Sequence, residues 1–506
     1  MASGWSHMSD SVAMTGEHRA DAPLPDHRLT TSLLVAFACA SAVIVARSIL
    51  FLAYEGLHFD SDQAVFGLMA KHLSEGRAFP LFMYGQHYLL ATSAWLAAPF
   101  IRIWGCQVFA IKLPQLLLNV VVCALLLERL MAEARLSAKA ALACLLPFLA
   151  PSVVASSRLV EHQGGIIEPF VWILLLWCLR RRALLLGLVA GVGFLNREFT
   201  AYGIAALLAI ELLARRWRER AWWRERLAGA AAFGSVLLAV HLLRPLSTNA
   251  FGASPAVKWR GWERASMRLA AVCGDFLPTL FGWRRTPLSR FAISSELECG
   301  HDWLFAFGLL FGAAVALRVA WLWLRRRPTL AQAGLPLYLV AVGVLTFVVY
   351  VALGRGAGQA MYLRYVMLLL LLPVGLLAAE LMLETRRSVR LSIVAVLVAL
   401  AAANAWDHAR LALDCRQHAP GSPQRLLANE LVFRGVRVGV APYWAAYHVS
   451  YLSGEAVRLS ASDAPRIREY EELVRREAGR AVSITDAPCA AGQEPVADWC
   501  LASSVP

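Results

Sequence analysis

Apolar stretches long enough to cross a lipid bilayer recur between residues 31 and 406 of this chain. A transmembrane helix needs about 20 mainly apolar residues to cross the hydrocarbon layer. With 506 residues, of which 58% are hydrophobic and 17% charged, the chain is too apolar for a soluble protein and too long for a single membrane anchor. The sequence therefore predicts a polytopic α-helical membrane protein.

Blocks of arginine between the apolar stretches set the orientation. They include residues 180–182, 325–327 and 386–387. Lys and Arg gather in short cytoplasmic loops, so the net charge of +14 reflects membrane topology better than nucleic-acid binding. Placing each block inside predicts a cytoplasmic N-terminus, residues 1–30, and about 11 transmembrane helices. The predicted spans are residues 31–53, 113–130, 139–156, 166–179, 184–196, 200–214, 227–243, 303–323, 334–353, 364–383 and 390–406.

The first loop, residues 54–112, then lies on the outer face. It contains an apolar stretch, residues 88–104, which we predict to lie at the membrane surface, because a crossing there would place the 180–182 arginines outside. The transmembrane region is followed by a tail, residues 407–506. The alternation of strand and helix patterns in this tail predicts a small soluble α/β domain on the outer face. Its predicted strands are residues 436–440, 456–460 and 481–485, and its predicted helices are residues 443–452 and 465–478.

The outer compartment is oxidising and permits disulfide bonds. Of the cysteines that fall outside in this topology, Cys489 and Cys500 are the pair nearest in sequence. We therefore predict a disulfide between them.

Two aspartates, Asp60 and Asp62, follow the first apolar stretch directly. Carboxylates crowded at a membrane surface cost free energy, so their presence indicates a functional role. Residues 63–75 then place apolar side chains one turn apart and end at Gly76, which predicts an amphipathic helix on the membrane surface. Asp60 or Asp62 is suited to cap this helix. Since a cap needs only one carboxylate, the other is a candidate for chemistry.

In this order of motifs the chain resembles the C-type membrane glycosyltransferases, such as the protein O-mannosyltransferases and the aminoarabinose transferases. The paired acids after the first span correspond to the family's acidic site. Further along come Arg158 in the second outer loop, a glycine-rich helix that ends in Arg197, and Arg364 before a late apolar stretch. The resemblance covers roughly residues 31–406.

The chain departs from the family at several of these places. Arg197 stands where the family frequently has Lys, and the second outer loop offers Glu161 and Glu168 where the family usually has Asp. The segment containing Tyr84 and His87 stands in place of a proline-rich entry.

The resemblance implies an enzyme of the inner (plasma) membrane with its active site on the periplasmic or outer face. Its activity would be the transfer of a hexosyl or pentosyl group from a polyprenyl-phosphate donor to a hydroxyl of an unspecified glycan, lipid or protein. Asp60 is the predicted general base, with Asp62 as second choice, because a positioned carboxylate can take the acceptor's proton. Arginines can stabilise the departing phosphate. The predicted substrate-binding residues are Arg158, Glu161, Glu168, Arg197, Arg364, Tyr84 and His87.

The alternative to a glycosyltransferase is a membrane transporter or lipid flippase. A third candidate function is that of a non-catalytic membrane assembly factor. Transporters usually place ionisable groups near the bilayer midplane and show two related halves. Here the acids cluster at one face and no such halves are visible. His87, His162 and His301 also fall outside and are candidate metal ligands beside the carboxylates, although the sequence requires no divalent metal or other cofactor.

Overall fold

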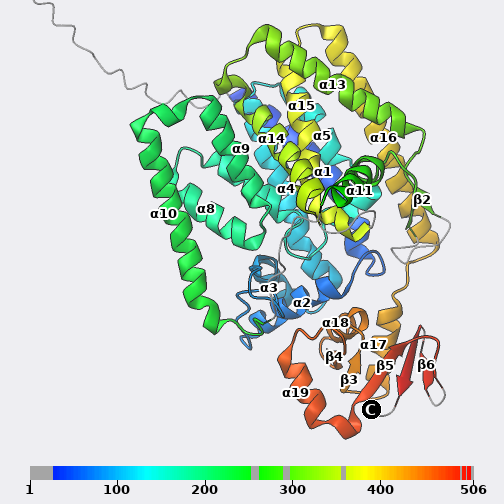
Figure 1. The fold of residues 1–506 in the computed structure, drawn as a ribbon. Helices are drawn as coiled ribbons and strands as arrows, with labels where there is room; N and C mark the ends of the chain where they lie inside the picture. The colour runs from blue at the N-terminus through cyan, green and yellow to red at the C-terminus, as the bar shows by residue number, and fades with distance from the viewer. Residues whose placement is uncertain are drawn as a thin grey trace, which may run out of the picture.

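The computed structural model describes residues 27–251, 261–288, 297–354, 360–490, 493–496 and 498–502. Figure 1 shows a large bundle of helices, with the C-terminal strands gathered below it. The helices α2 (Ser61–Ser74) and α3 (Thr92–Trp104) lie between the bundle and the strands (Figure 1). Most of the predicted cytoplasmic N-terminus lies outside the described residues.

Six of the described helices are long and apolar enough to cross a membrane. They are α1 (His27–Ala53), α4 (Val108–Ala132), α10 (Arg220–Leu243), α13 (Leu304–Arg326), α14 (Leu330–Leu353) and α16 (Arg387–Gln417). A seventh is the pair α5 (Ala138–Leu149) and α6 (Val153–Leu159), if these helices, which meet at 91°, count as one broken span.

Shorter apolar helices complete the bundle. They are α7 (Glu168–Cys178), α8 (Ala183–Asn196), α9 (Thr200–Leu213) and α15 (Leu371–Leu383). Each predicted span falls on one of the long, bent or short helices. The number of crossings stays a prediction, because these short helices have fewer residues than a simple crossing needs.

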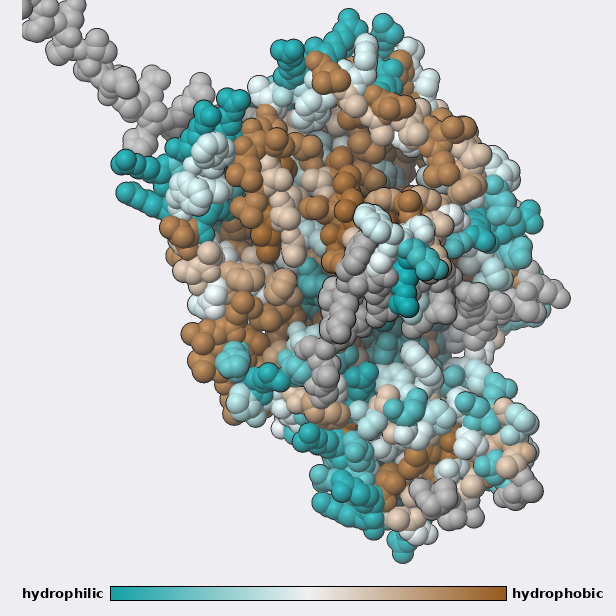
Figure 2. Space-filling model, viewed as in Figure 1, coloured by the Kyte–Doolittle hydropathy of each residue, from teal (hydrophilic) through white to brown (hydrophobic). Residues whose placement is uncertain are grey.

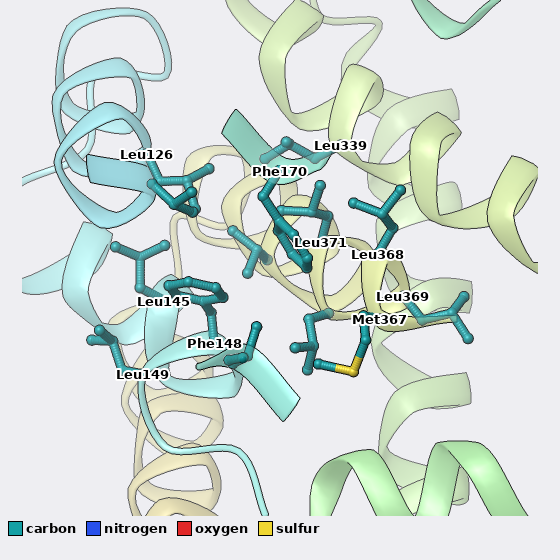
Figure 3. Packing of buried hydrophobic residues seen from close by; sticks show 14 of the residues in the cluster. Leu126, Leu145, Phe148, Leu149, Phe170, Leu339, Met367, Leu368, Leu369 and Leu371 are labelled. Carbon is teal, nitrogen blue, oxygen red and sulfur yellow. The ribbon is translucent and has the colours of Figure 1, made fainter. Parts of the chain in front are cut away.

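Large apolar side chains fill the core of the bundle. Figure 3 shows Phe148 and Phe170 among leucines from neighbouring helices. Both rings are fully buried, and their centroids lie 5.9 Å apart. The outer helices instead expose leucines such as Leu238 and Leu310. Figure 2 shows apolar residues over much of the outside of the bundle, as expected of a surface that faces lipid.

The helix predicted to lie on the membrane surface is α2, and its predicted environment is wrong. It begins after Asp60 and stops before Gly76, whose φ of 67° ends the helix. However, the run of residues 63–70 is buried on every side, because α2 packs between α3 and α18 (Tyr443–Leu452). The apolar spacing in its sequence marks a buried helix and not an amphipathic one.

Short elements connect α10 to α13. They are α11 (Trp262–Ala271), a π-helical turn (Val272–Phe276), α12 (Leu277–Phe281), β1 (Thr286–Pro287) and β2 (Glu298–Cys299). The two strands pair antiparallel.

The end of the chain forms a five-stranded sheet in the order β4-β3-β5-β7-β6. Strands β4, β3 and β5 are parallel, and β7 pairs antiparallel with β5 and β6. The elements are α17 (Pro423–Phe433), β3 (Val438–Ala441), α18, β4 (Arg458–Ala461), α19 (Arg468–Arg476), β5 (Val482–Asp486), β6 (Glu494–Val496) and β7 (Trp499–Ala502). The predicted disulfide between Cys489 and Cys500 is confirmed.

Candidate active site

The predicted site residues converge on the loop of residues 160–167, which joins α6 to α7. Groups of this loop contact Asp60, Arg158, Arg197 and Arg364. Gly164 and Gly165 give the loop its shape, with φ angles of 64° and 100°. A Cβ on Gly164 would also lie 2.7 Å from the ring of Phe66 on α2, so glycine lets the loop approach that helix closely.

Asp60 is the residue that caps α2. Its Oδ1 accepts a hydrogen bond from the backbone N–H of Gln63 at 3.0 Å, and its Oδ2 accepts one from Nε2 of Gln163 at 2.8 Å. Burial, together with the carboxylates of Glu161 and Asp62, raises the pKa of Asp60 to about 7. A carboxyl with a pKa near neutrality is well suited to accept a proton at physiological pH.

Asp62 is bound from two sides. The hydroxyl of Tyr443, at the start of α18, donates a hydrogen bond to Oδ1 of Asp62. On the other side, Nη1 of Arg364 lies 3.7 Å from Oδ2 and also donates to Oε1 of Gln163 at 2.8 Å. Gln163 therefore links the two predicted catalytic aspartates, one directly and one through Arg364.

Glu161 anchors a buried cluster of charges beside Asp60. Its Oε2 lies 2.6 Å from Nη1 of Arg158 and 3.1 Å from Nε2 of His58. Burial raises the pKa of Glu161, but Arg158 and His58 outweigh it and lower the pKa to about 2. Burial and Arg158 lower the pKa of His58 to about 4. At neutral pH this cluster is an ionised Glu161 and Arg158 pair beside a neutral histidine.

Glu168 and Arg197 both hold the 160–167 loop in place. Oε2 of Glu168 accepts from the backbone N–H groups of Gly165 and Ile166 at 3.0 and 3.1 Å, while Oε1 accepts from Ser93 and from Gln115. This buried carboxylate therefore shapes the start of α7. Arg197, directly after α8, donates from Nε to the carbonyl of Gly164 at 2.7 Å.

A cavity of about 470 Å³ opens beside Asp60. Its wall combines acids and bases from distant parts of the chain, namely Glu55, His58, Asp60, Arg158, Asp275, Arg284, Arg285 and His448. Asp62 does not line it. Of the two aspartates, Asp60 is thus the one that a ligand in this cavity meets.

An apolar cavity of about 320 Å³ lies in the bundle between α5, α12, α13, α15 and α16. It is close to the polar cavity, because the segment of residues 275–281 contributes to both: Phe276 and Thr279 face the polar cavity, and Leu277 and Phe281 face the apolar one. The molecule therefore offers a polar chamber next to an apolar one.

Two predicted substrate contacts lie elsewhere. Tyr84 is fully buried, and its hydroxyl bonds to Nδ1 of His72 at 3.0 Å, away from the polar cavity. His87 packs edge-on against the ring of Tyr88. Within the described part of the chain, no group of three or more His, Cys, Asp or Glu side chains is arranged to hold a metal ion.

Sequence reasoning missed the residues that position the acids. Gln163 lies between Glu161 and Glu168, which stand out in the sequence by their charge. Its neutral amide gives no such sign of a role. The sequence marks Lys112 only as the end of the predicted first loop. Its buried Nζ donates to the carbonyls of Phe51, Leu57 and His58 at 2.9, 3.2 and 3.0 Å, and so fixes the chain just before Asp60.

No protein-family model matches the sequence, and no curated protein matches it. Solved structures do match the fold. Two of them are ArnT from Cupriavidus metallidurans, in the apo state and bound to undecaprenyl phosphate. Each has a TM-score of 0.57 and 12% sequence identity, over 93% of this chain and 98% of the ArnT chain. The predicted resemblance to an aminoarabinose transferase-like fold is therefore confirmed at the level of the fold.

Proposed function

We propose that this protein transfers a sugar from a polyprenyl-phosphate donor to an acceptor hydroxyl on the outer face of the membrane. The observation that carries the proposal is Asp60, a carboxyl with a pKa of about 7 that borders a polar cavity shared with Arg158. The fold supports it, because one of the similar ArnT structures is bound to undecaprenyl phosphate.

The reaction needs a base on one side of the anomeric carbon and a stabilised leaving group on the other. The acceptor oxygen forms a bond to the anomeric carbon while its proton passes to Asp60. The bond from that carbon to the phosphate oxygen breaks, and polyprenyl phosphate leaves with the bonding electrons. A positioned carboxylate base contributes typically about 10²- to 10⁴-fold to such a step.

Arginines supply the positive charge that the departing phosphate requires. Arg158, Arg284 and Arg285 line the cavity. Arg197 and Arg364 do not line it but donate hydrogen bonds to the 160–167 loop. Guanidinium groups bind phosphate oxygens through paired hydrogen bonds, which suits this task. The adjoining apolar cavity gives the polyprenyl chain a place to begin its path into the bundle.

Purified full-length protein, incubated with lipid extract that contains polyprenyl-phosphate sugars and with membrane acceptors, tests this function. We expect release of polyprenyl phosphate and movement of labelled sugar into a new product. The matched control is the double variant Asp60→Asn with Asp62→Asn, for which we expect no release. Equal release by the control would contradict the proposal, and movement of intact donor across a vesicle membrane without cleavage would favour the flippase alternative.

A further inference from the structure

Two adjoining polar cavities lie at the arginine-rich ends of the helices. Their volumes are about 540 and about 420 Å³, and both are lined by Glu133, Arg135 and Gln332. We call them the basic cavities. α4 is 25 residues long; it carries Lys112 in its first turns, near the candidate active site, and ends at these cavities. A helix of that length spans about 37 Å, so the basic cavities are remote from Asp60.

The basic cavities carry a surplus of positive charge. Glu133 is the one acid among the described residues that line them, and it is already paired with Arg129 at 3.1 Å and Arg180 at 3.2 Å. Within the described part of the chain, Arg135 and Arg390 form no ion pair or side-chain hydrogen bond. Arg135 lines both cavities from a left-handed backbone position, with a φ of 52°, which is uncommon for arginine.

Part of the lining of the larger cavity is apolar. This apolar lining consists of Leu136, Leu381, Met382 and Leu383, and Arg390 lines the same cavity. A cavity lined both by unpaired guanidinium groups and by aliphatic side chains suits an amphiphile with an anionic head. Guanidinium groups prefer phosphate oxygens, and basic pockets between transmembrane helices on the cytoplasmic side bind the head groups of anionic lipids.

We propose that the basic cavities bind the phosphate group of an anionic phospholipid, held by Arg135 and Arg390, with the start of an acyl chain against Leu381 and Met382. This lipid joins the loop between α4 and α5, which carries Arg135, to the end of α15 and the first turn of α16, which carries Arg390. The site is independent of the donor lipid, because it lies at the other end of the bundle from Asp60.

Binding is tested on the purified protein in neutral detergent by native mass spectrometry, with phosphatidylglycerol as probe and phosphatidylcholine as the zwitterionic comparison. The cavity variant is Arg135→Gln with Arg390→Gln. The matched control is Arg182→Gln with Arg387→Gln, which removes the same charge from exposed positions of the same face that do not line the cavities. We expect the cavity variant to bind phosphatidylglycerol about 10- to 30-fold more weakly and the control to match the parent protein.

Inorganic phosphate is tested alone as a second probe, by thermal shift. Stabilisation by phosphatidylglycerol but not by phosphate identifies the ligand as a lipid. Stabilisation by phosphate that is lost in the cavity variant identifies a free phosphate instead, with the same two arginines as its ligands. Equal binding of both probes by the parent, the cavity variant and the control would overturn the proposal. The single variant Arg135→Gln, at an exposed position, repeats the measurement if the double variant fails to fold.

Discussion

Asp60 both caps α2 and borders the polar cavity, because the cap holds its carboxyl at the end of α2 that faces the cavity. The cap fixes the carboxyl at the start of α2, while Gln163 holds its second oxygen. Asp62 is fixed equally well, but its partners Tyr443 and Arg364 keep it out of the cavity wall. Asp60 is therefore the candidate base, and Asp62 adds to the effect of burial and of Glu161, which raise the pKa of Asp60.

The pKa of Asp60 leads to a prediction about pH. The pKa of Asp60 is about 7. At a lower pH, Asp60 holds a proton and cannot take one from the acceptor hydroxyl. Transfer should therefore increase as the pH rises through about 7 and level off above it. His58 and Glu161, with pKa values of about 4 and 2, stay outside this window. A profile of kcat/KM between pH 5.5 and 8.5 checks this, and a flat or falling profile would contradict it.

Tyr443 gives a second prediction at the residue scale. Burial and the Asp62 carboxylate raise the pKa of Tyr443, so its hydroxyl stays protonated and donates to Asp62. We expect Tyr443→Phe to lower transfer about tenfold, since a hydrogen bond to a charged group is worth about 1.5 to 3 kcal/mol. The control is Tyr451→Phe on the same helix, whose hydroxyl donates to the carbonyl of Gln107 instead. Equal losses in both variants would show that only the docking of α18 matters.

At the scale of elements, α2 and α18 form one unit that carries the site. A Cβ on Gly67 of α2 would lie 2.5 Å from the ring of Tyr451, so glycine permits this close contact. Glu455, in the turn after α18, accepts from Lys71 at 2.7 Å, from His72 at 3.0 Å and from Tyr470 at 2.8 Å. The C-terminal segment thereby holds the helix that Asp60 caps.

Because Glu455 holds α2 through these contacts, we expect Glu455→Gln to lose stability. Burial raises the pKa of Glu455, but the hydrogen bonds from His72 and Lys71 outweigh it and hold that pKa well below its ordinary value. Removing one partner of such a buried ionic cluster costs about 3 to 5 kcal/mol. Thermal unfolding of the purified variant measures this loss of stability. Limited proteolysis then shows whether the C-terminal segment has become more accessible. The control is Glu494→Gln in the exposed pair with Arg434, for which we expect no measurable change.

The elements also show what the sequence can reveal. Length and apolar content located the helices of the bundle, and in the tail β3, β4, β5, α18 and α19 lie close to their predicted bounds. The helix α17 and the strands β6 and β7 were not predicted, and the predicted start of the tail at residue 407 lies inside α16. The burial of α2 was not foreseen, because apolar spacing does not reveal that a segment 380 residues later covers the other face. For the same reason Tyr443 gave no sign that it contacts Asp62. Charged residues near the first span could be singled out, whereas neutral Gln163 could not.

In the whole molecule, we expect the C-terminal sheet and the arginine-rich loops to lie on opposite sides of the membrane. The apolar belt of Figure 2 separates hydrophilic residues at the top of the view from those near the C-terminal segment. Single cysteines at Glu472 on α19 and at Arg181, both exposed, test this. In intact cells we expect a membrane-impermeant maleimide to label the first and to label the second only after permeabilisation, above the background of the parent chain. The reverse pattern would refute the topology.

The turnover of Asp60→Asn shows whether Asp60 is the general base of glycosyl transfer. Asn keeps the shape and most of the capping capacity of Asp, so the variant should fold with a loss of at most about 1 kcal/mol. If Asp60 accepts the proton, turnover with saturating donor lipid should fall by about 10² or more. Near-normal turnover in folded Asp60→Asn would contradict this role of Asp60, and loss in Asp62→Asn alone would move the base two residues along the chain.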